Sequence, residues 1–322
     1  MGRLLAIAIV IVGLAALTQS ARPNFVYPTE RTLVEARPIR GETRLGAFEV
    51  VGAWKLFSRS KGFGGFSGLL VSGGKVLGVS DAGGTARFRV GSGIRWRADI
   101  QPISQTSEGP RRPALPGGDL EGATGSGGDW WVASEWRNAI CEMSGGPRCR
   151  QPAAMAGWPR HFGPEALARL PDGRFLVLGE GDGKSASPAV LFDRDPTFPG
   201  AVATRLRYTP PPGYRVTDAA ALPDGRILLL HRRLAPLFES RITVLPGLPG
   251  PGQPAVRGQV LATIGAGPYR ENYEGLAVDA RDPSLLWLIS DDNFAWYQST
   301  KLLALRLPTQ KGSAATALPF AK

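Results

Sequence analysis

The chain has 322 residues, of which 43% are apolar, 42 are glycine and 28 are proline, and its formal net charge is +11 at pH 7. This composition can bury a substantial core and indicates many turns between short strands, in one large all-β domain or two smaller ones. The positive charge comes from scattered arginines rather than from a cluster on one predicted element, which argues against a nucleic-acid-binding protein. Small anionic partners remain compatible with it.

The first 21 residues have the order of a secretory signal peptide. A basic residue, Arg3, precedes an apolar run over residues 4–17 and a polar end with small residues. The run is too short for a comfortable transmembrane span, and an uncleaved anchor is the alternative. Both interpretations predict an exported domain, periplasmic or secreted, and cleavage predicts no membrane contact. We expect a monomer with this division: signal peptide 1–21, linker 22–40, folded domain 41–308 and flexible tail 309–322.

Five stretches of the domain share one pattern, a short apolar run on each side of a turn. Two of them contain the pentapeptide LPDGR, at residues 170–174 and 222–226, and the others cover residues 66–84, 120–138 and 273–293. Asp-Gly between apolar runs predicts a β-hairpin with a two-residue turn. The anchor residues chosen for the five stretches are 54, 44, 53 and 56 residues apart, in the order Ser67, Glu121, Glu165, Asp218 and Glu274.

Each interval between anchors has room for two further strands. Four short strands per unit are typical of a β-propeller blade, so the sequence predicts an all-β propeller with five visible units. A sixth, degenerate unit is left open. A β-sandwich is the alternative, but it gives no reason for a repeated motif. Residues 46–57 are expected to close the ring beside the last strands.

The chain contains two cysteines, Cys141 and Cys149, on either side of a Gly-Gly-Pro turn. In an exported chain this spacing predicts a disulfide that clips a hairpin, and two free thiols are the alternative. Two cysteines are too few ligands for a zinc site.

The domain resembles the phytase-like propeller family of bacteria, which is named for an esterase-like activity of phytase. The resemblance lies mainly in YEGLAVDARDPSLLWLISDDNF and STKLLALRL near the C-terminus, with FSGLLV, LEGATG and PEALARLPDGRFLVLGE upstream. It implies hydrolysis of esters and phytate. In the first unit Ser67 stands where the pattern has glutamate.

Acidic residues recur in register at the open ends of the predicted hairpins. With two- or three-residue turns, each anchor faces a second polar residue across the hairpin. In a propeller these ends meet at one rim of the central channel. The expected pairs are Glu121 with Glu135, Glu165 with Glu180, Asp218 with His231, Glu274 with Asp291, and Ser67 with Ser80 or Asp81.

Opposed carboxylates repel one another, so the predicted rim requires a compensating charge. Calcium, which favours six to eight oxygen ligands, is the expected cofactor. The alternatives are protonated carboxyls or arginine counterions, namely Arg87, Arg137, Arg160, Arg232 and Arg233. Carboxylates that only cap turns or face solvent are a further interpretation. The predicted metal ligands are Glu121, Glu165, Glu180, Asp218, Glu274, Asp291 and Asp292.

The sequence contains no conventional nucleophile motif. We therefore expect a metal-dependent hydrolase of phosphate or other esters, acting on a small anionic or ester substrate. The residues assigned to catalysis are Glu274, Asp291, Glu165 and His231, and His161 is expected near the rim as a polar loop residue. The alternative is a non-catalytic propeller that binds a ligand or partner.

Overall fold

The computed structural model describes residues 27–103, 119–126, 128–234, 236–248 and 255–307. The predicted signal peptide and C-terminal tail lie outside these residues. The described chain is almost entirely β, with one 3₁₀ turn, η1 (Ala153–Met155). Within these ranges no helix is long and apolar enough to cross a membrane.

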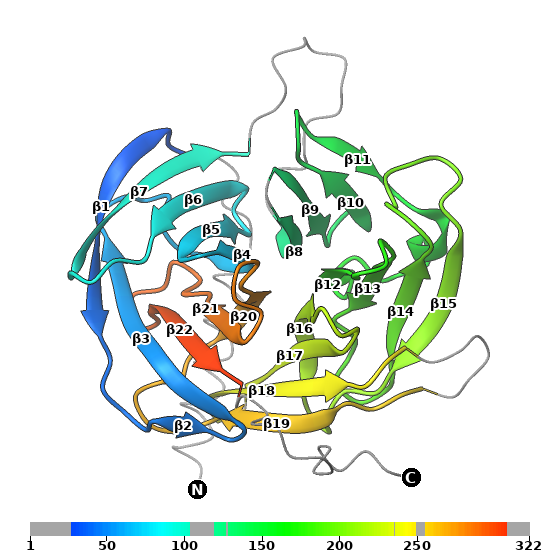
Figure 1. Ribbon diagram of the computed structural model, residues 1–322. Coiled ribbons are helices and arrows are strands. Elements are labelled where there is room, and N and C mark those ends of the chain that lie inside the picture. Colours follow the sequence, from blue (N-terminus) through cyan, green and yellow to red (C-terminus); the bar gives the residue numbers. More distant parts are fainter. Residues whose placement is uncertain (1–26, 104–118, 127, 235, 249–254, 308–322) are drawn as a thin grey trace, which may run out of the picture.

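The described strands form five four-stranded antiparallel sets, arranged around a central axis (Figure 1), which confirms the predicted all-β propeller. Units one to three consist of consecutive strands: β4 (Phe66–Ser72), β5 (Lys75–Ser80), β6 (Gly84–Arg89) and β7 (Arg95–Pro102); β8 (Leu120–Ser126), β9 (Asp129–Ser134), β10 (Ala139–Glu142) and β11 (Arg148–Arg150); β12 (Pro164–Arg169), β13 (Phe175–Gly179), β14 (Ser187–Phe192) and β15 (Ala203–Tyr208).

Unit four is also consecutive, whereas unit five takes its outer strand from the N-terminal part of the chain. The strands are β16 (Arg215–Ala221), β17 (Ile227–Leu234), β18 (Phe238–Leu245) and β19 (Gln259–Ile264), then β20 (Tyr273–Val278), β21 (Leu285–Ser290), β22 (Thr300–Arg306) and β3 (Phe48–Ser58). In each unit the first strand, β4, β8, β12, β16 or β20, lies nearest the axis (Figure 1).

The ring is closed by the segment predicted to close it. Strand β3 pairs with β22, which confirms the prediction for residues 46–57. Strand β1 (Glu30–Pro38) then pairs with both β3 and β7, and joins the outer edges of units five and one into a single sheet. The short β2 (Arg44–Leu45) pairs with β3. Buried apolar clusters fill the spaces between neighbouring units and hold the five inner strands in place.

The two LPDGR turns are longer than predicted. The Leu170 N–H donates to the Arg174 carbonyl (2.8 Å) and the Gly173 N–H to the Leu170 carbonyl (3.0 Å). Gly173 has a φ of 88°, while Asp172 is not in the positive-φ region, so the loop is not the two-residue type I′ turn predicted from Asp-Gly. The turn at residues 222–226 repeats the same bonds at 2.8 and 3.0 Å.

Every inner hairpin also carries a β-bulge close to its open end. The pairing register shifts between Phe66 and Gly68, Leu120 and Ala123, Pro164 and Ala166, Val216 and Asp218, and Tyr273 and Gly275. The predicted cross-strand pairs are therefore wrong as direct register partners. A bulge leaves one residue without a partner in the ladder and turns its side chain to a new direction.

The predicted disulfide between Cys141 and Cys149 is present, and it joins residues that face each other in β10 and β11. Closing a loop this short removes chain entropy from the unfolded state, which stabilises the fold by about 2–3 kcal/mol in the loop-closure model.

Candidate functional site

The bulges and the strand ends above them place ten side chains in two rings at one end of the channel. The bulge ring consists of the residues at the register shifts: Ser67, Glu121, Glu165, Thr217 and Glu274. In each hairpin, the last residue of the inner strand before the bulge pairs with a residue of the second strand. The residues that come next in the chain after those second-strand residues form the rim ring: Asp81, Glu135, Glu180, Arg232 and Asp291. Seven of these ten side chains are carboxylic acids.

Unit four departs from the sequence prediction by one residue. Its bulge residue is Thr217 rather than Asp218, and Asp218 faces Leu230 rather than His231. The buried Asp218 carboxylate accepts hydrogen bonds from the N–H groups of Ala219 (2.8 Å) and Leu276 (2.7 Å), so it links two inner strands and takes no place in either ring. Burial raises its pKa well above the usual value, since it has no ion pair within the described chain.

His231 also lies outside the site, although it was assigned to catalysis. Its ring is fully buried, with Nε2 2.9 Å from the Tyr208 hydroxyl and Nδ1 3.2 Å from the Arg241 carbonyl oxygen. Burial lowers the pKa of His231 to about 4. The next residue, Arg232, occupies the ring position instead. The repeat itself carried the signal: the 52-residue offset between the LPDGR copies relates Glu165 to Thr217 and Glu180 to Arg232.

Glu121 and Glu165 are the two ring carboxylates that lack a hydrogen-bond donor in the described parts of the chain. Their exposed fractions are 9% and 4%. Burial raises the pKa of both well above the usual value, and neighbouring carboxylates raise it further: Glu165 acts on Glu121, and Glu180 on Glu165. A buried carboxylate without a donor or counterion is costly, so this pair requires a proton or a cation.

Glu121 belongs to a triad with Asp119 and Glu135, whose ligand oxygens all lie within 4.8 Å of one another. The prediction omitted Asp119, which lies just before β8 with a φ of 68° and accepts the Trp136 N–H at 2.8 Å. Burial is the largest cause that raises the pKa of Glu135 to about 8, and Asp119 adds to it. The exposed His161 lies over the edge of the Trp136 ring, with centroids 4.9 Å apart, which places it near the rim as predicted.

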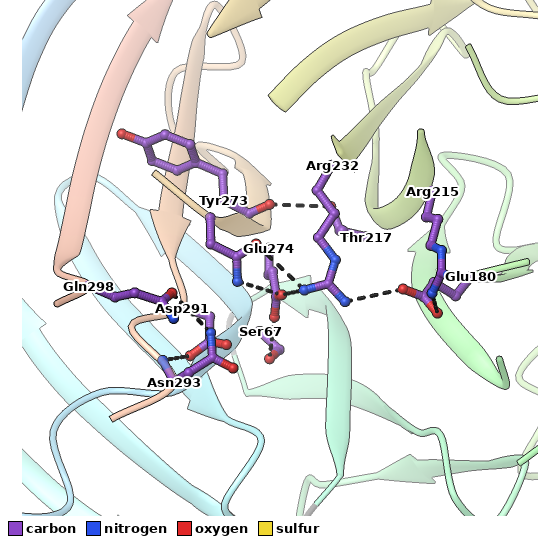
Figure 2. Close-up of polar contacts among 11 residues, drawn as sticks. Ser67, Glu180, Arg215, Thr217, Arg232, Tyr273, Glu274, Asp291, Asn293 and Gln298 are labelled. Atoms are coloured by element: carbon purple, nitrogen blue, oxygen red, sulfur yellow. Dashed lines mark hydrogen bonds and ion pairs between the residues drawn. The ribbon is translucent and has the colours of Figure 1, made fainter. Parts of the chain in front are cut away.

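Arg232 is the one basic member of the two rings, and its guanidinium bridges two units (Figure 2). Its Nη2 donates to Glu180 Oε1 at 3.1 Å, and its Nη1 donates to Glu274. Burial alone would lower the pKa of Arg232, but Glu274, Glu180 and Glu165 together raise it well above the usual value. Arg215 adds a second bond to Glu180 at 3.1 Å.

Glu274 is the best-bonded carboxylate of the bulge ring. Besides Arg232, it accepts hydrogen bonds from Ser67 Oγ (3.1 Å) and Asn272 Nδ2 (2.8 Å). Ser67, the residue that departs from the glutamate pattern, therefore serves as a donor to the neighbouring unit. This half of the two rings is already compensated by protein groups.

Asp291 and Asp292 differ in what they bond. Asp291, which is 2% exposed, accepts the Asn293 N–H at 2.6 Å, and burial followed by Glu274 raises its pKa well above the usual value. Asp292 uses both oxygens on protein donors: the N–H groups of Gly65 (3.0 Å) and Phe294 (3.1 Å) and the Thr300 hydroxyl (2.9 Å). Asp292 thus fastens its loop and is not directed at the rings as a ligand.

In the described residues, none of the other candidate counterions forms an ion pair with a ring carboxylate. Arg87 donates to Gln101, Arg160 lies over the Trp136 ring, Arg233 pairs with Glu239, and Arg137 is exposed. Of the five arginines considered from the sequence, Arg232 is the one that neutralises ring carboxylates.

The geometry suits a hard divalent cation. Calcium takes six to eight oxygen ligands, and the two rings with Asp119 offer eight carboxyl groups, two of them buried without donors. Asp119, Glu121 and Glu135, whose ligand oxygens lie within 4.8 Å of one another, could therefore hold a metal ion. Asp81 also requires a proton or a cation to compensate its charge. Burial is the largest cause that raises its pKa to about 7, and the nearby Glu274 is the next.

Comparisons with known proteins agree with this picture at the level of family. A model of the family described as phytase-like, esterase-like activity of phytase, matches residues 61–294. A search of curated proteins found no match. Among solved structures, glutaminyl cyclase of Myxococcus xanthus is 13% identical, with 76% of this chain and 90% of that chain covered and a TM-score of 0.46. A gluconolactonase of Xanthomonas campestris is 12% identical, with 88% and 99% covered and a TM-score of 0.45. Similarities this distant carry no argument about the site.

Proposed function

Since the chain belongs to the phytase-like family, we propose that it is an exported, metal-dependent hydrolase of phosphate or other esters. The observation that carries the proposal is the pair of buried carboxylates, Glu121 and Glu165, which have no donor in the described chain and lie at the channel end. The signal-like first 21 residues and the Cys141–Cys149 disulfide support export.

Cation binding and substrate binding are assigned to different side chains at this end of the channel. Glu121 and Glu165, with Asp119 and Glu135, would hold the cation, which when bound polarises a phosphoryl or carbonyl oxygen and lowers the pKa of a water molecule. Arg215, whose side chain is 41% exposed and has one bond to Glu180, is placed to hold an anionic group of the ester at the mouth.

Glu274 and Glu165 have different surroundings, which suits them to different roles. Arg232, Asn272 and Ser67 all donate to Glu274, so this carboxylate is held in one orientation. Glu165 has no hydrogen-bond donor in the described chain, so an oxygen that the cation leaves free would be available to accept a proton from an attacking water molecule.

The proposal is tested with the double variant Glu121→Gln/Glu165→Gln. In the wild type, calcium should raise the melting temperature and support hydrolysis of p-nitrophenyl phosphate or p-nitrophenyl acetate, and chelation should abolish both. In the double variant we expect calcium affinity to fall by more than about 100-fold, with loss of turnover, because two direct ligands are removed and an outer-shell partner alone accounts for about 10–100-fold.

The matched control is Glu30→Gln/Glu49→Gln, which neutralises two exposed glutamates and should leave calcium binding unchanged. The proposed hydrolase function is contradicted if the wild type shows neither a calcium-dependent shift of the melting temperature nor turnover of either ester. The alternative, a non-catalytic binding propeller, is favoured if calcium binds but neither ester is hydrolysed.

A further inference from the structure

We propose that Arg232 acts as a built-in cation that limits the two rings to one divalent cation, bound in the sector of Asp119, Glu121 and Glu135. The inference rests on the cation binding in the proposed function and deepens it by assigning the stoichiometry to one residue. It follows from how charge is divided between the two halves of the rings.

One half of the rings is compensated by protein groups. The Arg232 guanidinium forms ion pairs with Glu180 of unit three and Glu274 of unit five (Figure 2). It therefore connects unit four to the units on both sides of it. Its side chain is 21% exposed, so the two ion pairs are largely shielded from water. Arg215 and Asn272 complete the bonding of the two carboxylates.

The other half has no ion pair of this kind. In the described ranges, no lysine or arginine forms an ion pair with Asp119, Glu121 or Glu135. Their oxygens lie within 4.8 Å of one another, and Glu121, which is 9% exposed, has no hydrogen-bond donor there. A buried, unpartnered carboxylate directed at two others is the arrangement that a divalent cation completes.

A second cation is excluded by the guanidinium itself. A calcium ion close to Glu180 and Glu274 would lie beside a fixed positive charge, which repels it and already occupies an oxygen of each carboxylate. Removing the guanidinium would leave Glu180, Glu274 and the nearby Asp291 as a second group of acidic oxygens, with Ser67 and Asn272 as neutral ligands.

The experiment counts calcium ions bound per chain, by equilibrium dialysis of chelator-treated protein followed by elemental analysis. We expect one ion in the wild type, one in Arg232→Lys and two in Arg232→Met. Arg226→Met is the matched control in the same hairpin; its guanidinium pairs with the exposed Asp224, and the count should stay at one. Two ions in the wild type, or one in Arg232→Met, overturns the inference.

Two variants test the location of the ion without relying on the folding of Arg232→Met. Glu121→Gln should lower the count from one to zero at a calcium concentration that saturates the wild type, whereas Glu274→Gln should leave it at one. The reverse result overturns the inference and the assignment of Glu121 as a ligand, but it leaves a metal-dependent hydrolase as the proposed function. No calcium in the wild type contradicts both.

Discussion

Units three and four begin with hairpins that are nearly the same in backbone and opposite in chemistry. Both contain LPDGR, close the turn with hydrogen bonds of 2.8 and 3.0 Å, and have a glycine with a φ of 88° at the same place. Both have a bulge near the open end. Yet the ring residues are Glu165 and Glu180 in unit three, and Thr217 and Arg232 in unit four.

The comparison shows that the repeat determines where a side chain lies but not what charge it carries. Turn residues and the bulge set the backbone, so Thr217 and Arg232 reach the positions that Glu165 and Glu180 occupy one unit earlier. Individual positions then set the charge. Arg232 and Glu180 occupy corresponding positions in the two units, and Arg232 donates a hydrogen bond to Glu180. The charge difference between the units therefore produces a stabilising contact between them at the channel end.

The largest effect that separates the two units should come from Arg232→Met in calcium-free buffer. The substitution leaves Glu180 and Glu274 without their buried counterion, which typically costs about 3–5 kcal/mol of unfolding free energy. Arg226→Met, in the same hairpin, breaks only the exposed pair with Asp224 and should cost less than about 1 kcal/mol. Urea unfolding in the presence of a chelator measures both, and equal losses would contradict a special role for unit four.

A smaller contrast is expected in the pH dependence of stability without calcium. The folded-state pKa values of Asp81 and Glu135, about 7 and about 8, exceed the unfolded values near 4. The folded state therefore binds more protons, and the stability from these acids is present below about pH 4 and lost as pH rises through about 7 to 8.

His231 of unit four acts in the opposite direction. Its folded pKa of about 4 is below the unfolded value of about 6.5, so its contribution is present above pH 6.5 and lost as pH falls towards 4. Melting temperatures between pH 4 and 9 should therefore fall on the alkaline side in the wild type. Asp81→Asn/Glu135→Gln should reduce that fall without changing the acid side, and the other buried carboxyls with raised pKa values account for the rest. Saturating calcium should reduce the fall as well, because cation binding favours ionised carboxylates. An alkaline fall of unchanged size in the double variant would contradict the assignment.

The fold and much of the site could be predicted because both depend on local, repeated signals. Apolar runs around turns placed the inner hairpins, and the recurrence of Glu121, Glu165 and Glu274 showed that carboxylates meet at one end. The closing strand was predictable because residues 46–57 form a largely apolar stretch that lies before the first repeat and is not needed to complete any of the other units. These features depend on spacing, which a sequence shows directly.

The exact register could not be read, because a bulge adds one residue to one strand and has no distinct sequence signature at Glu165 or Glu274. In unit four the nearest acidic residue is Asp218, whereas the 52-residue offset of the repeat indicates Thr217. Asp119 was missed because its place near Glu121 depends on a positive φ just before β8. The bonds of Arg232 to two other units are tertiary contacts that no local pattern encodes.

The smallest expected effect tests whether the two hairpins are alike in backbone energetics. An added Cβ at Gly173 or Gly225 meets no heavy atom within 4 Å, so Gly173→Ala and Gly225→Ala have no steric cost from neighbours. What remains is the positive φ, 88° at both glycines, which costs an alanine roughly 1 kcal/mol. Urea unfolding should show equal losses for the two variants, and calcium affinity should not change because both turns lie at the closed ends of their hairpins. A loss at one glycine but not the other would mean that the two backbones differ, and that the charge difference between the units extends to their turns.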